Sequence, residues 1–206
     1  MKLKVCGMRE PENITAVSSI KPDFFGLIFY EKSPRFVSLE DAKTLPQFDD
    51  IKRIGVFVNE TVEQMLLTSS ETNLYALQLH GSESHEICRE LKSKNSDLKI
   101  IKAFSVDEFF DGSELESYRN VCDYFLFDTK TPQHGGSGKE FNWEILHNFH
   151  IGKPFFLGGG IGGQNVEKAV NACENLPLFA IDVNSKAEIS HGVKSPQIIA
   201  EIKDKL

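Results

Sequence analysis

The sequence has little of what marks secreted, membrane-spanning or disulfide-stabilised proteins. Its 206 residues include only four cysteines, and none of them forms a CxxC pair. No stretch approaches the roughly 18 apolar residues that span a bilayer, and the amino terminus, MKLKVCGMRE, lacks the apolar segment of a signal peptide. We therefore expect Cys6, Cys88, Cys122 and Cys173 to be reduced thiols in a cytoplasmic protein with no membrane partner.

An excess of positive charge is also lacking. The formal net charge is -7 and the pI is near 5.4. The lysines and arginines are scattered along the chain, whereas proteins that bind nucleic acid cluster them against the phosphate backbone. We therefore expect no nucleic-acid partner. A small anionic substrate is still compatible with this charge, because backbone N–H groups and helix N-termini hold phosphate without a basic surface.

Linkers and low-complexity segments are absent as well. Hydrophobic residues make up 40% of the chain and charged residues 26%, as in ordinary globular proteins. A chain of this length can bury a sizeable core. We therefore expect one domain over residues 1–206.

Patterns that bind metal are missing too. The six histidines form no HExxH motif, and the cysteines offer no tetrahedral cluster. Asp123, Asp128 and Asp182 are chemically able to bind Mg²⁺, but nothing in their spacing requires an ion. We expect no metal.

What the sequence does contain is a repeated alternation of apolar, strand-like runs with amphipathic, helix-like segments. Most runs are continuously apolar, as expected of parallel strands covered on both faces, and they recur roughly every 20 to 30 residues. Helix start signals lie between them, such as Thr61 before Val62. The segment 108–119 is the least regular, because its Asp-Gly-Ser sequence indicates a late helix start. The eight runs are Leu3–Cys6, Phe24–Phe29, Lys52–Val58, Ala76–Leu79, Lys99–Ala103, Tyr124–Phe127, Pro154–Leu157 and Leu178–Asp182.

Eight strand and helix units in about 200 residues indicate an α/β fold, a single (β/α)₈ TIM barrel. A doubly wound open sheet would also alternate, but eight units without a second domain fit a closed barrel better. In such a barrel the active site lies at the carboxyl ends of the strands. The residues that collect there are Cys6-Gly7, Ser33-Pro34-Arg35, Asn59, Gln78-Leu79-His80-Gly81, Asp128, Gly158-Gly159-Gly160 and Asp182 to Ser185.

A glycine-rich run follows the seventh predicted strand. Residues 158–163 satisfy GxGxxG, and Asp182 lies about 20 residues further on, which is the spacing of a dinucleotide fingerprint. The run belongs to the seventh unit, however, and Asp182 ends the last strand, which leaves no room for a dinucleotide fold. We instead expect a phosphate cradle, with a second wall at 182–185 and a short extra helix near Ser185. The alternative is that the glycines only form a tight turn.

Four side chains at the strand ends differ in how much they indicate by themselves. Arg35 is able to pair with a carboxylate over the barrel mouth, but a loop arginine is often only solvated. His80 serves equally well as a ligand or as a loop histidine that bonds a carbonyl. Cys6 alone would be interpreted as a small buried hydrophobe. Asp128 is more informative, because a carboxylate that directly follows a buried strand requires a partner or a function.

Taken in order, these motifs resemble the phosphoribosylanthranilate isomerase family along almost the entire chain. Six or more motifs occur in the family's order, which makes the resemblance specific. The matching segments are Lys4-Val5-Cys6-Gly7-Met8, Gly26-Leu27-Ile28-Phe29-Tyr30 with Ser33-Pro34-Arg35, Gly55-Val56-Phe57-Val58-Asn59, Gln78-Leu79-His80-Gly81, Asp128 followed by Gly135-Gly136-Ser137-Gly138, Gly159-Gly160 with Asn165-Val166, and Asp182-Val183.

The resemblance implies a cofactor-free Amadori rearrangement of a small phosphosugar in tryptophan biosynthesis. An acid must protonate the furanose oxygen and a base must remove the proton from C2; by resemblance these are Asp128 and Cys6. A free thiol has a pKa of about 8.5, so Cys6 must act as a minority thiolate or have its pKa lowered by neighbours. Arg35 would hold the anthranilate carboxylate. The other expected substrate-binding residues are His80, Gly159, Gly160, Asp182, Asn184 and Ser185.

The chain departs from the family pattern at two places. The family usually has Ser-Ser-Gly after Asp-Val in strand 8, whereas this chain has Asn184-Ser185-Lys186. Glycines also stand at Gly158 and at Gly162 and Gly163, where the family often has other residues. Two other functions stay open, namely the related histidine-pathway isomerase, which uses a pair of aspartates, and a silent phosphosugar-binding protein. The oligomeric state, monomer or homodimer, is open as well.

One further expectation concerns Lys4, which lies two residues before Cys6 and therefore points to the same side of its strand. A buried ammonium needs a carboxylate partner. Barrel closure makes strand 8 the neighbour of strand 1, so we predict a pair between Lys4 and Asp182, with Asp128 as second choice. The alternative is that Lys4 reaches solvent at the N-terminal end of its strand. The positive charge would also favour the Cys6 thiolate.

Overall fold

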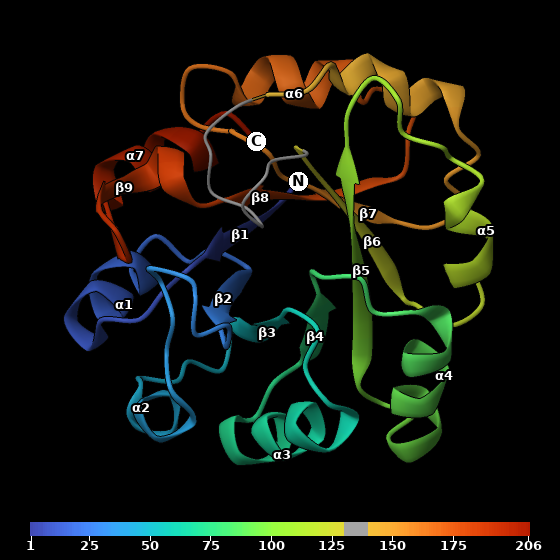
Figure 1. Ribbon diagram of the computed structural model, residues 1–206. Coiled ribbons are helices and arrows are strands. Elements are labelled where there is room, and N and C mark those ends of the chain that lie inside the picture. The colour runs from blue at the N-terminus through green and yellow to red at the C-terminus, as the bar shows by residue number, and fades with distance from the viewer. Residues whose placement is uncertain (130–139) are drawn as a thin grey trace.

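The computed structural model describes residues 1–129 and 140–206 and shows a closed barrel of eight parallel strands. The strands form the centre and the helices an outer ring (Figure 1). All eight predicted strands are present, and the barrel closes through pairing of β1 with β8. The predicted motif Gly135-Gly136-Ser137-Gly138 lies outside the described residues. The strands are β1 Lys2–Cys6, β2 Phe24–Ile28, β3 Lys52–Phe57, β4 Ala76–Leu79, β5 Lys99–Val106, β6 Tyr124–Thr129, β7 Phe155–Leu157 and β8 Leu178–Val183.

The outer ring contains short helices whose starts follow from local sequence. The Thr61 side chain accepts a hydrogen bond from the Gln64 amide and thereby caps α3. Helix α5 begins only at Glu114, after the Asp-Gly-Ser sequence, as expected. In the described part of the sixth connection, residues 140–154, the helix is a 3₁₀ helix. The elements are α1 Pro11–Ser18, α2 Leu39–Thr44, α3 Val62–Thr72, α4 His85–Lys94, α5 Glu114–Tyr118, η1 Trp143–Asn148, α6 Val166–Ala172 and α7 Pro196–Lys203.

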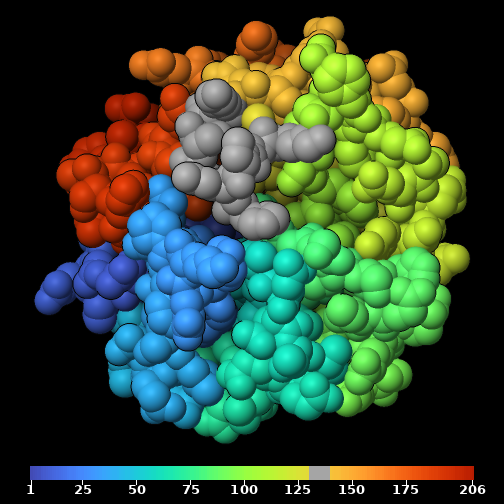
Figure 2. Space-filling model, in the orientation of Figure 1, coloured from blue at the N-terminus to red at the C-terminus, as the bar shows by residue number. Residues whose placement is uncertain are grey.

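Strand β8 is followed by a short excursion before α7. It comprises the three-residue 3₁₀ helix η2, Ser185–Ala187, and an antiparallel pair of β9, Glu188–Ser190, with β10, Val193–Lys194. The extra helix expected near Ser185 is thus a single 3₁₀ turn. The Asn13 side chain of α1 bonds both backbone groups of Lys194. The C-terminal segment therefore lies beside the N-terminal segment on the molecular surface (Figure 2).

The barrel interior is filled by two sets of inward-facing side chains. We call the first the apolar layer; it consists of Phe24, Ile54, Ala76, Ile101, Leu126, Phe156 and Ala180, all nearly inaccessible to solvent. Aromatic rings pack edge to face in it, and those of Phe24 and Phe156 lie 5.6 Å apart between centroids. We call the second set the polar layer; it consists of Lys4, Cys6, Gln78, His80, Asp128 and Asp182. Within the described ranges, no helix is both long and apolar enough to cross a membrane.

Candidate active site

The polar layer lies at the carboxyl ends of the strands, where the sequence predicted the active site. Lys4 is fully buried on β1, and its Nζ atom lies 2.8 Å from Asp182 Oδ2 on β8 and 2.7 Å from Gln78 Oε1 on β4. The predicted pair of Lys4 with Asp182 is therefore confirmed. Burial by itself would lower the pKa of Lys4, but the Asp182 carboxylate and Cys6 outweigh it and raise this pKa above its ordinary value. Lys4 is an ammonium ion.

The Cys6 thiol ends β1 and is 5% exposed. It fits because the neighbouring strand has a glycine: a Cβ atom at Gly26 would lie 2.7 Å from Cys6 Sγ. Burial raises the pKa of Cys6, and the nearby Lys4 and Lys194 ammonium groups only partly oppose this. Lys4 favours the thiolate, as expected, but desolvation exceeds this charge effect, so burial supports the first of the two alternatives drawn from the sequence, a minority thiolate. The thiolate is the minority form.

Asp128 lies one residue before the end of β6. Its Oδ1 accepts a hydrogen bond of 2.8 Å from the Thr129 amide, and its Oδ2 lies 3.4 Å from His80 Nε2. Gly159 closes the other side: a Cβ atom there would meet Thr129 Oγ1 at 2.4 Å and Asp128 Oδ1 at 3.2 Å. With φ at +83°, this position favours glycine for a second reason. The predicted residues Asp128, His80 and Gly159 are therefore neighbours.

The two carboxylate oxygens of Asp182 have different surroundings. Oδ2 accepts from Lys4, whereas Oδ1 is buried without a hydrogen-bond partner among residues 1–129 and 140–206. Burial raises the pKa of Asp182 above its ordinary value, and Lys4 only partly offsets this. A buried acceptor without a partner is costly, so this oxygen is suited to receive a hydrogen-bond donor from a ligand at the barrel mouth.

Arg35 is buried over the mouth and does not reach into bulk solvent. Its Nε and Nη2 atoms donate to the two carboxylate oxygens of Glu188, each at 2.7 Å. Lys194 Nζ lies 2.5 Å from Glu188 Oε1 and 2.7 Å from Asn184 Oδ1. Burial opposes the charge on Glu188, but Arg35 and Lys194 outweigh it and hold the pKa of this carboxyl at about 2. Burial also lowers the pKa of Lys194 to about 8.

Sequence reasoning missed Glu188, Lys194 and the role of Gln78. The first two follow strand 8 in a segment with no recognisable motif, and they become neighbours of Arg35 only because β9 and β10 fold back over the mouth. Gln78 carried a usable signal, because it lies two residues before His80 in a predicted strand and so faces the same side. Lys4 also faces inward, so the sequence alone could have predicted a hydrogen bond between Gln78 and Lys4.

The glycine-rich turn after β7 faces the turn after β8. Gly159 and Gly160 both have positive φ angles, +83° and +68°. A Cβ atom at Gly162 would lie 2.8 Å from the Cβ atom of Lys186. The two departures from the family pattern are thus in contact: the glycine at 162 makes room for a lysine where the family usually has glycine.

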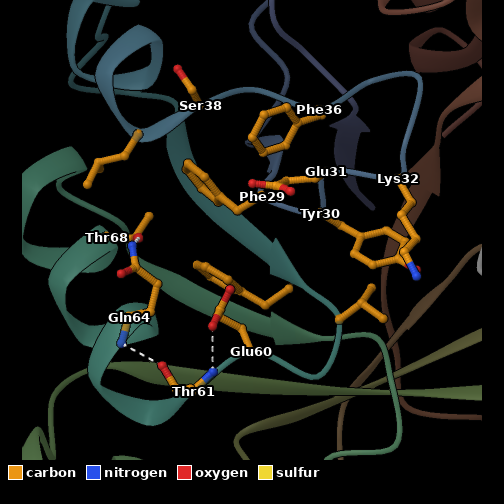
Figure 3. Close-up of a pocket in the computed structure, with 13 residues that line it drawn as sticks. Phe29, Tyr30, Glu31, Lys32, Phe36, Ser38, Glu60, Thr61, Gln64 and Thr68 are labelled. Atoms are coloured by element: carbon orange, nitrogen blue, oxygen red, sulfur yellow. Dashed lines mark hydrogen bonds between the residues drawn. The ribbon is translucent and has the colours of Figure 1, made fainter.

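A cavity of about 600 Å³ lies beside the polar layer and not within it. Its walls come from the segment after β2 and from the start of α3, with Phe29, Tyr30 and Phe36 opposite Thr61 and Gln64 (Figure 3). No residue of the polar layer lines it. It shares the loop 29–36 with Arg35, so it borders the arginine but holds none of the groups expected to react.

Known proteins match the chain over nearly its whole length. The family model described as N-(5'phosphoribosyl)anthranilate (PRA) isomerase matches residues 3–205. The N-(5'-phosphoribosyl)anthranilate isomerase of Phocaeicola vulgatus is 43% identical over 194 residues, 94% of this chain and 92% of that protein. The crystal structure of phosphoribosyl anthranilate isomerase from Thermotoga maritima has a TM-score of 0.86 at 33% identity and covers 100% of this chain and 98% of that one.

A further solved structure in this group carries a ligand. It is a phosphoribosyl anthranilate isomerase in complex with reduced 1-(o-carboxyphenylamino)-1-deoxyribulose 5-phosphate, with a TM-score of 0.82 at 30% identity, covering 100% of this chain and 98% of that one.

Proposed function

Because the chain belongs to the phosphoribosylanthranilate isomerase family, we propose that Cys6 is the general base and Asp128 the general acid of its reaction. The enzyme isomerises N-(5'-phosphoribosyl)anthranilate to 1-(2-carboxyphenylamino)-1-deoxyribulose 5-phosphate in tryptophan biosynthesis. The observation that carries the proposal is the polar layer itself: a thiol and a carboxyl at one barrel mouth, joined by buried charged groups. Burying charged groups costs free energy. Clusters of such groups are therefore found mainly at active sites.

The first step opens the furanose ring. Asp128, as the carboxylic acid, donates its proton to the ring oxygen while the bond from C1 to that oxygen breaks and the nitrogen lone pair forms the Schiff base. The carboxylate that results is met by the Thr129 amide at Oδ1 and by His80 Nε2 near Oδ2. Donors aimed at a developing charge are the usual source of such stabilisation.

The second step moves a proton from C2. The Cys6 thiolate removes it, and the electron pair flows through C1 to the protonated nitrogen to give an enaminol, which becomes the ketone when C1 gains a proton and the C2 hydroxyl loses one. Cys6 lies on β1 and Asp128 on β6, so base and acid approach the substrate from different sides of the barrel. Burial makes the Cys6 thiolate less stable than it would be in water, and the positive charges of Lys4 and Lys194 offset part of this loss.

Binding is divided among three groups of residues. Arg35 would bind the anthranilate carboxylate, supported by its buried position above the mouth. The turns with Gly159, Gly160, Asn184 and Ser185 would hold the phosphate through backbone N–H groups. Asp182 Oδ1 would accept a hydroxyl or amine proton of the substrate, and His80 would contact the ligand beside Asp128.

Three further properties stay predictions. One domain over residues 1–206 is supported by a single closed barrel. A cytoplasmic location is supported by four free cysteines. For the choice between monomer and homodimer, the structure reported as monomers generated from the dimeric phosphoribosylanthranilate isomerase of Thermotoga maritima, with a TM-score of 0.83 at 30% identity, shows that a dimeric relative exists.

The experiment for the residue roles follows the fluorescence of phosphoribosylanthranilate, which disappears on conversion. Wild-type enzyme should consume this substrate and leave the Amadori substrate of histidine biosynthesis unchanged. Cys6→Ala and Asp128→Asn should bind substrate but turn it over far more slowly. Turnover close to wild type in either variant would remove that residue from the mechanism.

A further inference from the structure

A continuous line of polar side chains crosses the barrel from β1 to β6. Lys4 Nζ donates to Gln78 Oε1 at 2.7 Å, Gln78 Nε2 lies 2.8 Å from His80 Nδ1, and His80 Nε2 lies 3.4 Å from Asp128 Oδ2. Lys4 and Gln78 are 0% and 1% exposed. Water therefore has little access to the first two links, and their geometry is set by the protein.

The direction of every hydrogen bond in this line follows from its first member. An ammonium group has three donors and no acceptor. Lys4 therefore requires the oxygen of the Gln78 amide, and Asp182 accepts another of its protons. With its oxygen turned to Lys4, the Gln78 amide can present only its NH₂ group to His80. The amide orientation is thus decided by charge.

This orientation selects one tautomer of the histidine. The Gln78 NH₂ group donates, so His80 Nδ1 must accept and cannot carry a proton. In the neutral ring the proton is then on Nε2, the atom that faces Asp128. A ring with protons on both nitrogens would set two donors against each other at 2.8 Å.

The histidine is also held in place by its backbone. The His80 amide donates to the Phe57 carbonyl at 2.8 Å. The next residue, Gly81, is tied down by Glu83, which accepts from its amide, and by Lys102, which donates to its carbonyl at 2.7 Å. Glu83 and Lys102 are themselves a buried pair with 2.9 Å between their charged atoms. The backbone that carries the ring is therefore fixed beside Gln78, whose Nε2 atom holds Nδ1 of the ring at 2.8 Å.

We propose that Lys4 and Gln78 are positioning residues that hold His80 as its Nε2–H tautomer, so that His80 donates a hydrogen bond to the Asp128 carboxylate formed when the substrate ring opens. The inference rests on the proposed role of Asp128 as general acid. His80 acts here as a fixed donor and not as a base, because its only unprotonated nitrogen is occupied by Gln78. The distance of 3.4 Å to Asp128 should shorten once that group carries its charge.

The first test needs no substrate. Protein with ¹⁵N-labelled histidine rings is studied by NMR, and the His80 signals are assigned by their loss in His80→Asn. Nε2 should carry the proton and Nδ1 should show the shift of an unprotonated ring nitrogen at neutral pH. A proton on Nδ1 would overturn the proposal whatever the variants do. Because this measurement is independent of turnover, it separates failure of the tautomer from failure of the proposed acid and base.

The second test breaks the line at Gln78. In Gln78→Glu the new carboxylate can only accept, so the single proton of the neutral His80 ring should move from Nε2 to Nδ1, and the donor that faces Asp128 is lost. As a result kcat should fall by about tenfold or more, while KM changes by less than about threefold. Gln78→Met, which lacks both hydrogen bonds, should give mixed tautomers and a smaller loss of kcat. Unchanged kcat in a folded variant whose tautomer has switched would overturn the proposal.

A matched control uses the same chemical change elsewhere. Gln197 is exposed at the start of α7, so Gln197→Glu should leave both the His80 signals and kcat as in wild type. Thermal unfolding of each variant shows whether it is folded at the assay temperature. If Gln78→Glu does not fold, the ring signals of the wild type and of Gln78→Met decide the proposal.

Discussion

The two layers inside the barrel share three strands, β4, β6 and β8, yet they are built from opposite chemistry. On β4, β6 and β8 the polar residue comes two positions after an apolar one: Gln78 after Ala76, Asp128 after Leu126 and Asp182 after Ala180. Period two keeps both members of each pair directed inward. Two residues along each of these strands, the barrel interior therefore changes from packed apolar side chains to polar and charged ones.

The two layers differ in the interactions that stabilise them. The apolar layer is stabilised because its side chains remove apolar surface from water. One apolar side chain in it can be replaced by another of similar volume at a small cost in stability. In the polar layer each group depends on a particular partner, because an unpaired charge or acceptor in that position is destabilising. Lys4 has two such partners, whereas Asp182 Oδ1 has no hydrogen-bond partner in the part of the chain that the structure describes. The apolar layer should thus tolerate change at a cost in stability, and the polar layer at a cost in function.

The largest expected effect comes from breaking the apolar layer. Phe156 is fully buried and packs against the rings of Phe24, Tyr124 and Phe179. Phe156→Ala should lower the free energy of unfolding by about 3–5 kcal/mol through the cavity it creates, measured by denaturant titration. Phe109→Ala, at a ring that is 82% exposed, is the control and should be nearly neutral. A loss below about 1 kcal/mol would mean that the layer collapses around the gap.

Breaking the polar layer should show the opposite pattern. Cys6→Ala and Asp128→Asn should each lower kcat by about 10² or more, as expected on loss of a general base or acid, while unfolding changes far less than in Phe156→Ala. Steady-state kinetics and thermal melts on the same preparations make the comparison. Cys173→Ala removes a buried thiol outside the mouth and should change only stability.

The titration of Cys6 tests whether burial or charge dominates in the polar layer. Burial disfavours the thiolate, so the thiol should lose its proton above its ordinary range, and the reactive fraction should grow about tenfold for each pH unit below that pKa. The ultraviolet absorbance of the thiolate, with Cys6→Ser as the blank, measures it. Lys4→Met removes an ammonium and should move the pKa higher still. An unshifted value in that variant would contradict the coupling of Lys4 to Cys6.

Arg35 belongs to the mouth but not to proton transfer, so its loss should affect binding first. Arg35→Met should raise KM by about tenfold with a smaller effect on kcat, because a charge-assisted contact with a carboxylate is lost. Part of the change will come from Glu188, for which Lys194 is then the one cationic partner among residues 1–129 and 140–206. Inhibition by free anthranilate separates the two, since it reports binding of the carboxylate alone. An unchanged KM would refute the assignment.

The smallest effect is expected where the two turns meet. Gly162→Ala puts a methyl group 2.8 Å from the Lys186 side chain and should cost about 1 kcal/mol of stability. Lys186→Gly restores the room, so the double variant should recover part of that loss in a double-mutant cycle. Additive losses would show that the contact between the turns is not coupled.

Much of this architecture follows from alternation alone. Eight apolar runs predicted eight strands, and the closure of a barrel made β1 and β8 neighbours, which was enough to predict the pair of Lys4 with Asp182. The same reasoning placed Cys6, Asp128 and His80 at one mouth. The alternation of side chains along a strand and the order of the strands can both be derived from the sequence. The rule that a buried charge needs a partner then predicts which of the inward groups pair.

Other features depended on segments that meet only after folding. The pairing of Arg35 with Glu188 joins residues 153 positions apart through a hairpin without a motif. The net direction of the Cys6 pKa depends on how completely the thiol is enclosed, and desolvation is a property of the whole surroundings, not of a neighbour in the sequence. The sequence by itself therefore determined which groups at the strand ends face the barrel mouth. Only the tertiary structure decided which of them are already paired, because partners and burial are set by distance in space.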